Sequence, residues 1–409
     1  MLITSPLSDQ WPEVRSLLPS GFDIEATARS RGAFTRARGV KDAETLLRLA
    51  LAYGGCGMSL RECCAWAAAT GVATLSDPAL LKRLGKASAW LGDLVAALLA
   101  EPSAAPGGRW AGYRLRAIDA SSICAPGADR TTWRLHAAYD LATGQVDHLE
   151  LTDVHGAESL SRFPFQPGEI EIADRGYARP RDLRPVLDAG ADLIVRTGWN
   201  ALSFSAADGA PFDLFAVLAG LSQDEGECSV AIRERKGEDP LPLRLVFRRK
   251  SPQEAREAQK RLVKDAKKRG KKPDPRSLEA ARYILLLTSL PAETFPASDV
   301  LALYRLRWQI ELAFKRFKSL AGLDQLPAKN PELARAWIHA RLITILLAER
   351  IAGKLPDSSP SAPENDEGQP IAMAKHKDNP RKHQSRHSWM PPMEGRTQRR
   401  RNKTATLPH

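Results

Sequence analysis

The chain has 409 residues, of which 43% are hydrophobic and 26% are charged, and its formal net charge at pH 7 is +12. This length allows two or three packed units, and the hydrophobic share is that of a globular protein with a real interior. The positive charge indicates an anionic partner, most commonly nucleic acid, although ribosomal, membrane-surface and merely basic proteins share this property.

The cysteine content argues against a disulfide scaffold and against structural zinc. No two of the five cysteines form a CxxC pair, and their number is odd; they are Cys56, Cys63, Cys64, Cys124 and Cys228. The first residues lack a basic stretch followed by an apolar core, and the most apolar segments are too short to span a membrane. We therefore expect a soluble cytoplasmic protein with reduced thiols and no membrane partner.

The first hundred residues have the periodicity of helices. Leucines recur at helical spacing in residues 42–53. Ser59 and Glu62 form a capping-box pattern for a helix that ends at Gly71, and residues 76–78 (Ser-Asp-Pro) can open the next helix. The sequence thus predicts a helical N-terminal domain in residues 1–105.

This domain carries two groups of basic residues. The last of its helices bears Lys82, Arg83 and Lys86, and a second basic run comprises Arg29, Arg31, Arg36, Arg38 and Lys41. Two helices joined by a short turn form either a helix-turn-helix that places its second helix in a DNA groove or an ordinary hairpin with a solvated basic face. In the first interpretation, the three residues of the last helix contact DNA.

A proline- and glycine-rich stretch at residues 101–108 marks a boundary, after which strands are expected. One strand ends at Asp119 and another ends at Asp174. The predicted elements are strands at 113–118, 134–141, 145–151 and 169–173, a helix at 180–189 and a strand at 192–196. This alternation favours a mixed α/β sheet.

This alternation of strands and helices is lost in residues 197–290, which contain short strand-like runs at 243–247 and 283–288. A very polar helix opens at Ser251 with a capping box and ends at Gly270. Its basic end either follows a DNA backbone or forms a solvated surface. Helices are then predicted at about 298–320 and 331–352. Residues 355–409 are rich in proline, serine and charge, which predicts a disordered basic tail.

Three acidic residues are candidates for a metal site. Asp119 and Asp174 each follow an apolar strand, where an open sheet delivers side chains to its edge. Glu311 has apolar neighbours, and a carboxylate in such surroundings needs a hydrogen bond, an ion pair or a cation; these neighbours are Trp308, Ile310, Leu312 and Phe314. Three carboxylates brought together suit Mg²⁺, although each could also be an ordinary surface acid.

Four residues around Glu311 have a regular spacing. Intervals of three, four and seven residues place them on one face of a predicted continuous helix; they are Tyr304, Arg307, Glu311 and Lys318. Such a face presents a metal ligand, a phenol and two cations that can bind phosphate. A salt-bridged surface helix is the alternative.

On these residues the chain resembles the DDE transposases of bacterial insertion sequences, specifically the IS-four-type group with the signature Y-x2-R-x3-E-x6-K. The signature matches the four residues just named, and the stretches 118–121 (IDAS) and 173–177 (ADRGY) resemble the two aspartate motifs of the family. The resemblance implies an RNase H-like mixed-sheet catalytic domain in residues 110–354, interrupted by a β-rich insertion at about 197–290.

The resemblance also implies roles for the residues. Asp119, Asp174 and Glu311 would be catalytic and would bind two Mg²⁺ ions, for which Mn²⁺ can substitute. Residues Tyr304, Arg307 and Lys318 would hold DNA, and Trp308, with Tyr283 as a weaker candidate, would stack on an unpaired base. The expected partner is double-stranded DNA with terminal inverted repeats, bound by a homodimer in the nucleoid.

Two alternatives to an active transposase follow from the same sequence. One is a defective copy that binds the ends of its element and regulates transposition without cutting. The other is a nuclease of RNase H-like fold acting on RNA or on unspecific DNA, which does not explain the insertion or the N-terminal helices. The family generally continues with packed helices after the signature lysine, so the tail at 355–409 suggests a frameshift or a truncated element.

Overall fold

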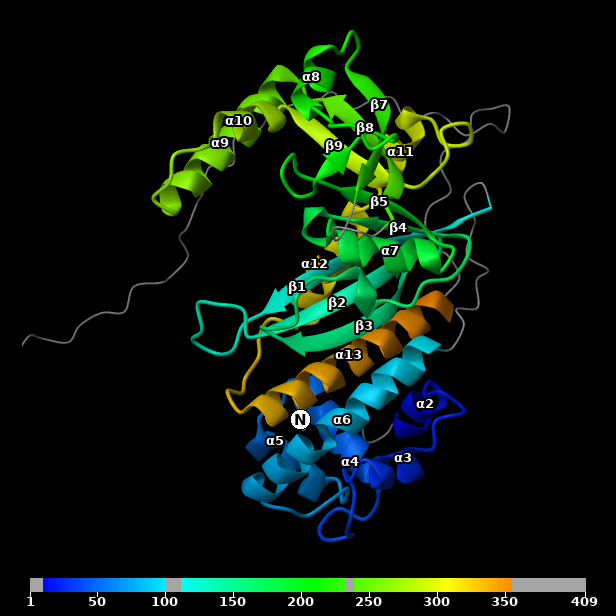
Figure 1. Cartoon of the computed structure of the whole chain (residues 1–409). Helices are drawn as coiled ribbons and strands as arrows, with labels where there is room; N and C mark the ends of the chain where they lie inside the picture. The colour runs from blue at the N-terminus through cyan, green and yellow to red at the C-terminus, as the bar shows by residue number, and fades with distance from the viewer. Residues whose placement is uncertain (1–9, 101–111, 233–238, 355–409) are drawn as a thin grey trace, which may run out of the picture. The chain divides into compact units, whose positions relative to one another are not determined.

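The structure is a computed structural model that describes residues 10–100, 112–232 and 239–354. These residues form a mixed α/β fold with a helical N-terminal part (Figure 1). The boundary expected at 101–108 and the tail expected at 355–409 lie outside the described residues. Within the described ranges, every helix is too short or too polar to cross a bilayer.

The N-terminal helices are α2 (Trp11–Ser16), α3 (Ile24–Ser30), α4 (Ala43–Ala50), a π-helical turn (Leu51–Gly55), α5 (Leu60–Ala69) and α6 (Asp77–Ala100). Three of them, α4, α5 and α6, begin where the sequence predicts, and two shorter ones, α2 and α3, precede them. The Asp42 side chain caps α4, and both hydrogen bonds of the capping box between Ser59 and Glu62 are formed at the start of α5. Gly71 follows α5 with a φ of +67°, which favours glycine over any residue with a side chain.

Within the described ranges, nine strands form one mixed sheet in the order β3-β2-β1-β4-β5-β9-β8-β7-β6 (Figure 1). The strands are β1 (Arg114–Ile123), β2 (Trp133–Asp140), β3 (Gln145–Asp153), β4 (Glu169–Ala173), β5 (Asp192–Arg196), β6 (Phe204–Ser205), β7 (Glu225–Ile232), β8 (Leu241–Arg249) and β9 (Tyr283–Thr288). Strand β1 is antiparallel to β2 and parallel to β4. The strands of the irregular segment extend the same sheet, because β9 pairs with β5 and β8 pairs with β9.

One strand is longer than predicted. The sequence predicts that the first strand ends at Asp119, but β1 continues to Ile123. Its pairing with β4 stops at Ile118, opposite Ala173, whereas its pairing with β2 goes on to the end of the strand. Asp119 therefore lies at the point where β1 loses one of its two neighbours.

The remaining helices are α7 (Pro180–Asp188), α8 (Leu214–Ala219), α9 (Pro252–Lys268), α10 (Pro275–Ala280), α11 (Ala297–Arg305), α12 (Trp308–Ser319) and α13 (Pro331–Lys354). The prediction of one helix over 298–320 is wrong, because a tight turn at Leu306 and Arg307 separates α11 from α12. In this turn the amides bond to carbonyls three residues back: Arg307 donates to Tyr304 at 3.2 Å, and Ile310 donates to Arg307 at 3.2 Å.

The N-terminal helices share a hydrophobic core with the last helix. Helix α13 packs along α6 and against the π-helical turn (Figure 1). The same core takes in buried side chains of α12 and of β1 and β2, including Phe317, Ala117 and Leu135. The helical part is thus anchored to the sheet that carries the acidic residues.

A buried ion network links the beginnings of β1 and β4. Arg116, on β1, donates to Glu171 of β4 at 2.9 Å and to Asp147 of β3 at 2.8 Å. Arg114 bonds Glu169 at 2.8 Å. Removing one partner of a buried pair leaves an uncompensated charge, so this network favours one alignment of the two strands.

A close approach of backbones between the π-helical turn and α13 gives a testable prediction. A Cβ atom at Gly54 would lie 2.5 Å from the Cβ of Ala340 and 2.8 Å from the carbonyl oxygen of Trp337. Gly54→Ala should therefore lower the free energy of unfolding by about 1–3 kcal/mol in urea denaturation. The control is Gly85→Ala inside α6, where the nearest atom would lie 3.6 Å away and stability should rise by about 0.5–1 kcal/mol. Equal effects of the two changes would contradict this packing.

Candidate active site

The parallel pairing of β1 and β4 brings Asp119 and Asp174 to the same edge of the sheet. Ile118 lies opposite Ala173 in the last register pair, and the two aspartates are the next residues of their chains. Their side chains are 23% and 41% exposed. Both carboxylates are thus held by backbone hydrogen bonding yet remain open on one side.

The turn between α11 and α12 faces these aspartates. The Tyr304 hydroxyl donates to Oδ1 of Asp174 at 3.3 Å. The Arg307 guanidinium contacts Oδ2 of Asp119 at 3.4 Å and Oε1 of Glu311 at 2.6 Å. Arg307 therefore lies between two of the three candidate carboxylates and neutralises part of their charge.

Lys318 approaches the same site from the end of α12. Its ammonium donates to the carbonyl oxygen of Ser122 on β1 at 2.7 Å. An open cleft of about 410 Å³ between β1 and α12 is lined by Asp119, Glu311 and Lys318. The four signature side chains are thus brought together at the sheet edge, although they do not share one face of one continuous helix.

Glu311 lies on the exposed part of α12. Its side chain is 56% exposed, and the neighbouring Trp308 and Leu312 are 49% and 39% exposed. Only Ile310 and Phe314 of its apolar neighbours are buried. Helix α12 is amphipathic and Glu311 lies outside its buried stripe, while the expected partner of its carboxylate is present as the ion pair with Arg307.

The electrostatics of Asp119 are those of a partly desolvated carboxyl group in an acidic cluster. Burial raises the pKa of Asp119 to about 6, and the negative charges of Asp174 and Glu158 act in the same direction. The amide of Ala120 and the guanidinium of Arg307 act to lower this pKa. A cation placed here would stabilise the ionised carboxylate.

The donor chemistry of the three carboxylates fits a hard divalent cation. Among the described residues, no three acidic, histidine or cysteine side chains already lie close enough to hold one metal ion. Arg307 instead places its positive charge between Asp119 and Glu311. The carboxylates thus already bind a cationic group, and Arg307 would have to release them for a metal to bind both.

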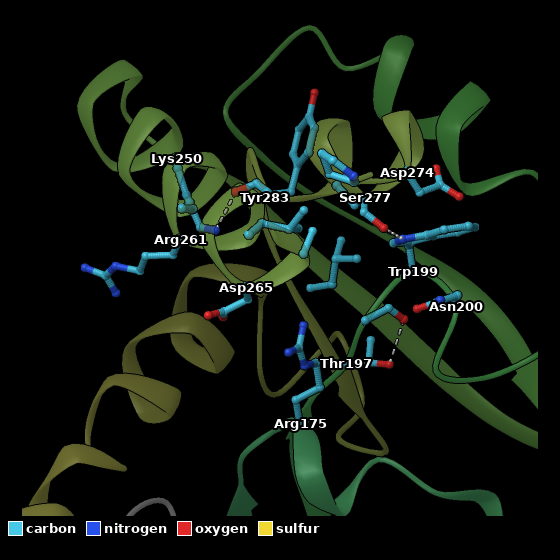
Figure 2. A pocket seen from close by; sticks show the side chains of 18 of the residues that line it. Arg175, Thr197, Trp199, Asn200, Lys250, Arg261, Asp265, Asp274, Ser277 and Tyr283 are labelled. Atoms are coloured by element: carbon cyan, nitrogen blue, oxygen red, sulfur yellow. Dashed lines mark hydrogen bonds between the residues drawn. The ribbon is translucent and has the colours of Figure 1, made fainter. Parts of the chain in front are cut away.

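A second cavity, of about 700 Å³, adjoins the acidic site between the end of β5, α9 and α10 (Figure 2). Arg196, the last residue of β5, approaches Asp174 at 3.9 Å and also lines this cavity. Lys250 donates to the carbonyl oxygen of Ala281 at 2.6 Å. Burial, together with the charges of nearby arginines, lowers the pKa of Lys250 to about 8.

An aromatic side chain forms another wall of this cavity. The indole nitrogen of Trp199 donates to Oγ of Ser277 at 3.0 Å, which fixes the ring (Figure 2). Sequence reasoning did not single out Trp199, Lys250 or Arg196. Arg196 could have been found, because it ends a strand beside the one that delivers Asp174.

Among the described residues, the basic side chains of α6 that were predicted to contact DNA make no hydrogen bond or ion pair with the acidic site. Lys82 and Lys86 are exposed on α6, whereas Arg83 donates to the carbonyls of Arg36 and Arg38. Tyr283 is 6% exposed and belongs to the hydrophobic core. Tyr283 also lines the second cavity, and its stacking on an unpaired base stays a prediction.

The position of Arg307 predicts a specific loss of stability. Without metal, Arg307→Gln should lower the free energy of unfolding by about 1–3 kcal/mol, because Asp119 and Glu311 lose the charge between them. The measurement is chemical denaturation in EDTA at low salt. The matched control is Arg305→Gln on the exposed side of the same segment, which should change stability by less than about 0.5 kcal/mol. Equal losses in both variants would contradict the bridging role.

Comparisons with known proteins find transposases over most of the chain. The family model described as "Transposase DDE domain" matches residues 110–347. The chain is 46% identical over 348 residues to the putative transposase InsL of insertion sequence element IS186A from Escherichia coli (strain K12), covering 84% of this chain and 94% of that protein. It is equally similar, at 46% over 349 residues and with the same coverage, to the transposase of insertion sequence element IS421 from Escherichia coli.

Among solved structures, this chain aligns with a piggyBac transposase synaptic complex with hairpin DNA. The alignment covers 90% of this chain and 88% of the piggyBac transposase chain. Its TM-score of 0.37 and its 11% identity are too low to bear on the fold. The family model spans more than half of the chain, and the two Escherichia coli relatives extend over most of it. The chain belongs to the DDE transposases of bacterial insertion sequences.

Proposed function

We propose that this transposase cuts DNA at the inverted ends of its own insertion sequence and joins the freed ends to new DNA. The observation that carries the proposal is the convergence of Asp119, Asp174 and Glu311 with one tyrosine and one arginine at a single sheet edge. The spacing of these residues supports placement in the IS-four-type group. The antiparallel β3-β2-β1 arrangement followed by parallel β4 and β5 supports an RNase H-like assignment for the catalytic part.

In this proposal the three carboxylates hold two Mg²⁺ ions, with Mn²⁺ able to replace them. Bound there, such ions would supply electrophilic stabilisation of the charge that develops on oxygen during a displacement at phosphorus. Asp119 and Asp174 provide fixed ligands because they follow paired strand residues. Glu311 is exposed on α12 and completes the set when Arg307 turns from it to a DNA phosphate.

The cationic groups around the carboxylates would position the DNA. Arg307 and Lys318 would contact phosphates beside the cut, and Tyr304 would orient Asp174 through its hydroxyl. Exposed Trp308 remains a candidate for stacking on an unpaired base. The cavity that contains Lys250 and adjoins Asp174 would accept the continuing DNA strand.

The organisation of the chain on DNA is also proposed. Residues 1–105 would form the helical DNA-binding part, and Lys82, Arg83 and Lys86 on α6 would approach the inverted repeat. The catalytic part would span 110–354, with the insertion at about 197–290 contributing the cavity beside Asp174. A homodimer would hold two element ends together, as closed two-fold assemblies commonly do.

The proposal predicts metal-dependent nicking that depends on Glu311. Glu311→Gln preserves the shape of the side chain but removes its charge, so cleavage of DNA carrying the ends of the element should fall at least about a hundredfold. Binding of the same DNA in a gel shift should remain. Glu293→Gln, an exposed change on the loop before α11, should cut as the wild type does.

Other outcomes of this assay distinguish the alternatives. If the wild-type protein binds the ends and cuts no DNA with Mg²⁺ or Mn²⁺, the chain is a binding-only regulator. If it cuts RNA or unrelated DNA equally well, the assignment to element ends is wrong.

The cavity beside Asp174 predicts a measurable phosphate contact. Lys250→Gln should reduce the slope of log K against log salt concentration by about 1, because one phosphate contact is lost. The matched control is Lys260→Gln, which lies on α9 but does not line the cavity. An unchanged slope for Lys250→Gln in DNA-binding titrations would remove this cavity from the DNA path.

A further inference from the structure

A fourth acidic side chain, Glu158, approaches the active site from the loop after β3. A Cβ atom at Gly176 would lie 2.2 Å from Oε2 of Glu158, so this carboxylate rests against the turn that follows Asp174. Its negative charge acts on both Asp119 and Tyr177. Glu158 is therefore a near neighbour of two candidate metal ligands, although it belongs to a different segment of the chain.

The loop that carries Glu158 is held in place by side chains on both sides of it. Arg134 donates to the carbonyl oxygen of Gly156 at 2.6 Å. Arg162 donates to the carbonyl oxygen of Ala157 at 2.8 Å. The hydroxyl of Ser159 donates to the buried carboxylate of Asp182 at 2.5 Å.

Glycine at position 156 is also required, because a Cβ atom there would lie 2.1 Å from Oγ1 of Thr152. Hydrogen bonds thus fix the residues immediately before and after Glu158. A side chain on so constrained a loop has a defined position before any ligand arrives.

Despite this constraint, the Glu158 carboxylate has no hydrogen bond or ion pair among the described residues. A second group in the same place also lacks a partner. The hydroxyl of Tyr177 is fully buried and makes no hydrogen bond within the described part of the chain. Leaving a buried polar group unpaired costs about 1–3 kcal/mol.

The negative charges of Asp119 and Glu158 oppose each other, and the buried Tyr177 hydroxyl near them has no partner in the described structure, so this group is unfavourable unless a positive charge joins it. Arg307 provides such a charge for Asp119 and Glu311, but the described structure gives Glu158 no comparable partner. A surface glutamate would be expected to point into water from a less constrained loop. The observed placement instead suits a group that completes a cation site.

We propose that Glu158 is a fourth carboxylate of the divalent-cation site formed with Asp119 and Asp174, and that Gly176 is needed to admit it. This inference rests on the proposed function, because it takes the two aspartates as metal ligands. The ligand class is a hard divalent cation, and Glu158 adds negative charge and an oxygen acceptor to the site. Its role is to strengthen and position cation binding.

The test is Mn²⁺ binding to the full chain without DNA, measured by isothermal titration calorimetry. Glu158→Gln should weaken Mn²⁺ binding about ten- to a hundredfold. Gly176→Ala should have a similar effect, because the added methyl group displaces the Glu158 carboxylate without removing its charge. Glu293→Gln is the control and should bind Mn²⁺ as the wild type does.

The melting temperature separates this role from a structural one. In EDTA, Glu158→Gln should melt at the wild-type temperature or above it, because like charges next to Asp119 are removed. The rise in melting temperature on adding Mg²⁺ should be smaller than in the wild type. Wild-type Mn²⁺ affinity in Glu158→Gln would overturn the inference, as would a lower melting temperature in EDTA with an undiminished Mg²⁺ effect.

The same titration with Glu311→Gln separates the two proposals. If Glu311→Gln weakens Mn²⁺ binding and Glu158→Gln does not, the three-carboxylate site stands and the role of Glu158 falls. If the wild-type protein binds no Mn²⁺, or if neither variant changes its binding, the metal site of the proposed function falls as well.

Discussion

The parallel register between β1 and β4 is the constraint on which the site depends. It sets Ile118 opposite Ala173 and thereby puts Asp119 and Asp174 next to each other. Because side chains alternate across a strand, a slip of one residue would turn one carboxylate to the opposite face of the sheet. The buried pairing of Arg116 with Glu171 at the start of the same strands opposes such a slip. The ion pair between Arg116 and Glu171, which takes no part in the proposed chemistry, thus helps to align Asp119 with Asp174.

A single turn of backbone determines what faces the aspartates. If residues 298–320 formed one straight helix, the spacing of Tyr304, Arg307 and Glu311 would align them along one stripe. The tight turn at Leu306 and Arg307 changes this geometry, so that Tyr304 contacts Asp174 and Arg307 contacts Asp119. The arginine also holds Glu311, and a cation would have to compete with that ion pair. Metal binding and the release of Arg307 to DNA are therefore coupled in the proposed function.

Local signals in the sequence predicted much of the fold. The capping box at Ser59 and the bounds of β4, β5 and β9 follow from residue pattern and are found as expected. The continuation of β1 past Asp119 was not predicted, because it depends on pairing with β2 and not on the strand's own sequence. The break between α11 and α12 has no proline or glycine to mark it, so periodicity alone extends one helix across it.

The candidate site was accessible from sequence only where residues lie close along the chain or match a known motif. The spacing around Glu311 and the two aspartates could be read directly. Glu158 could not be predicted from the sequence, because its place beside Gly176 follows from loop contacts that join distant segments. Lys250 and Trp199 were missed for the same reason, since their cavity forms only when α9 and α10 pack beside the end of β5.

The central claim is that three segments far apart in sequence hold the same divalent cations. The most direct test is to bind Fe²⁺ in place of Mg²⁺, generate hydroxyl radicals with peroxide and ascorbate, and map where the polypeptide is cut. The account predicts cuts near residues 119, 174 and 311 that excess Mg²⁺ suppresses together. Cuts confined to other regions, such as the histidine-containing tail, or cuts that Mg²⁺ does not suppress would contradict it.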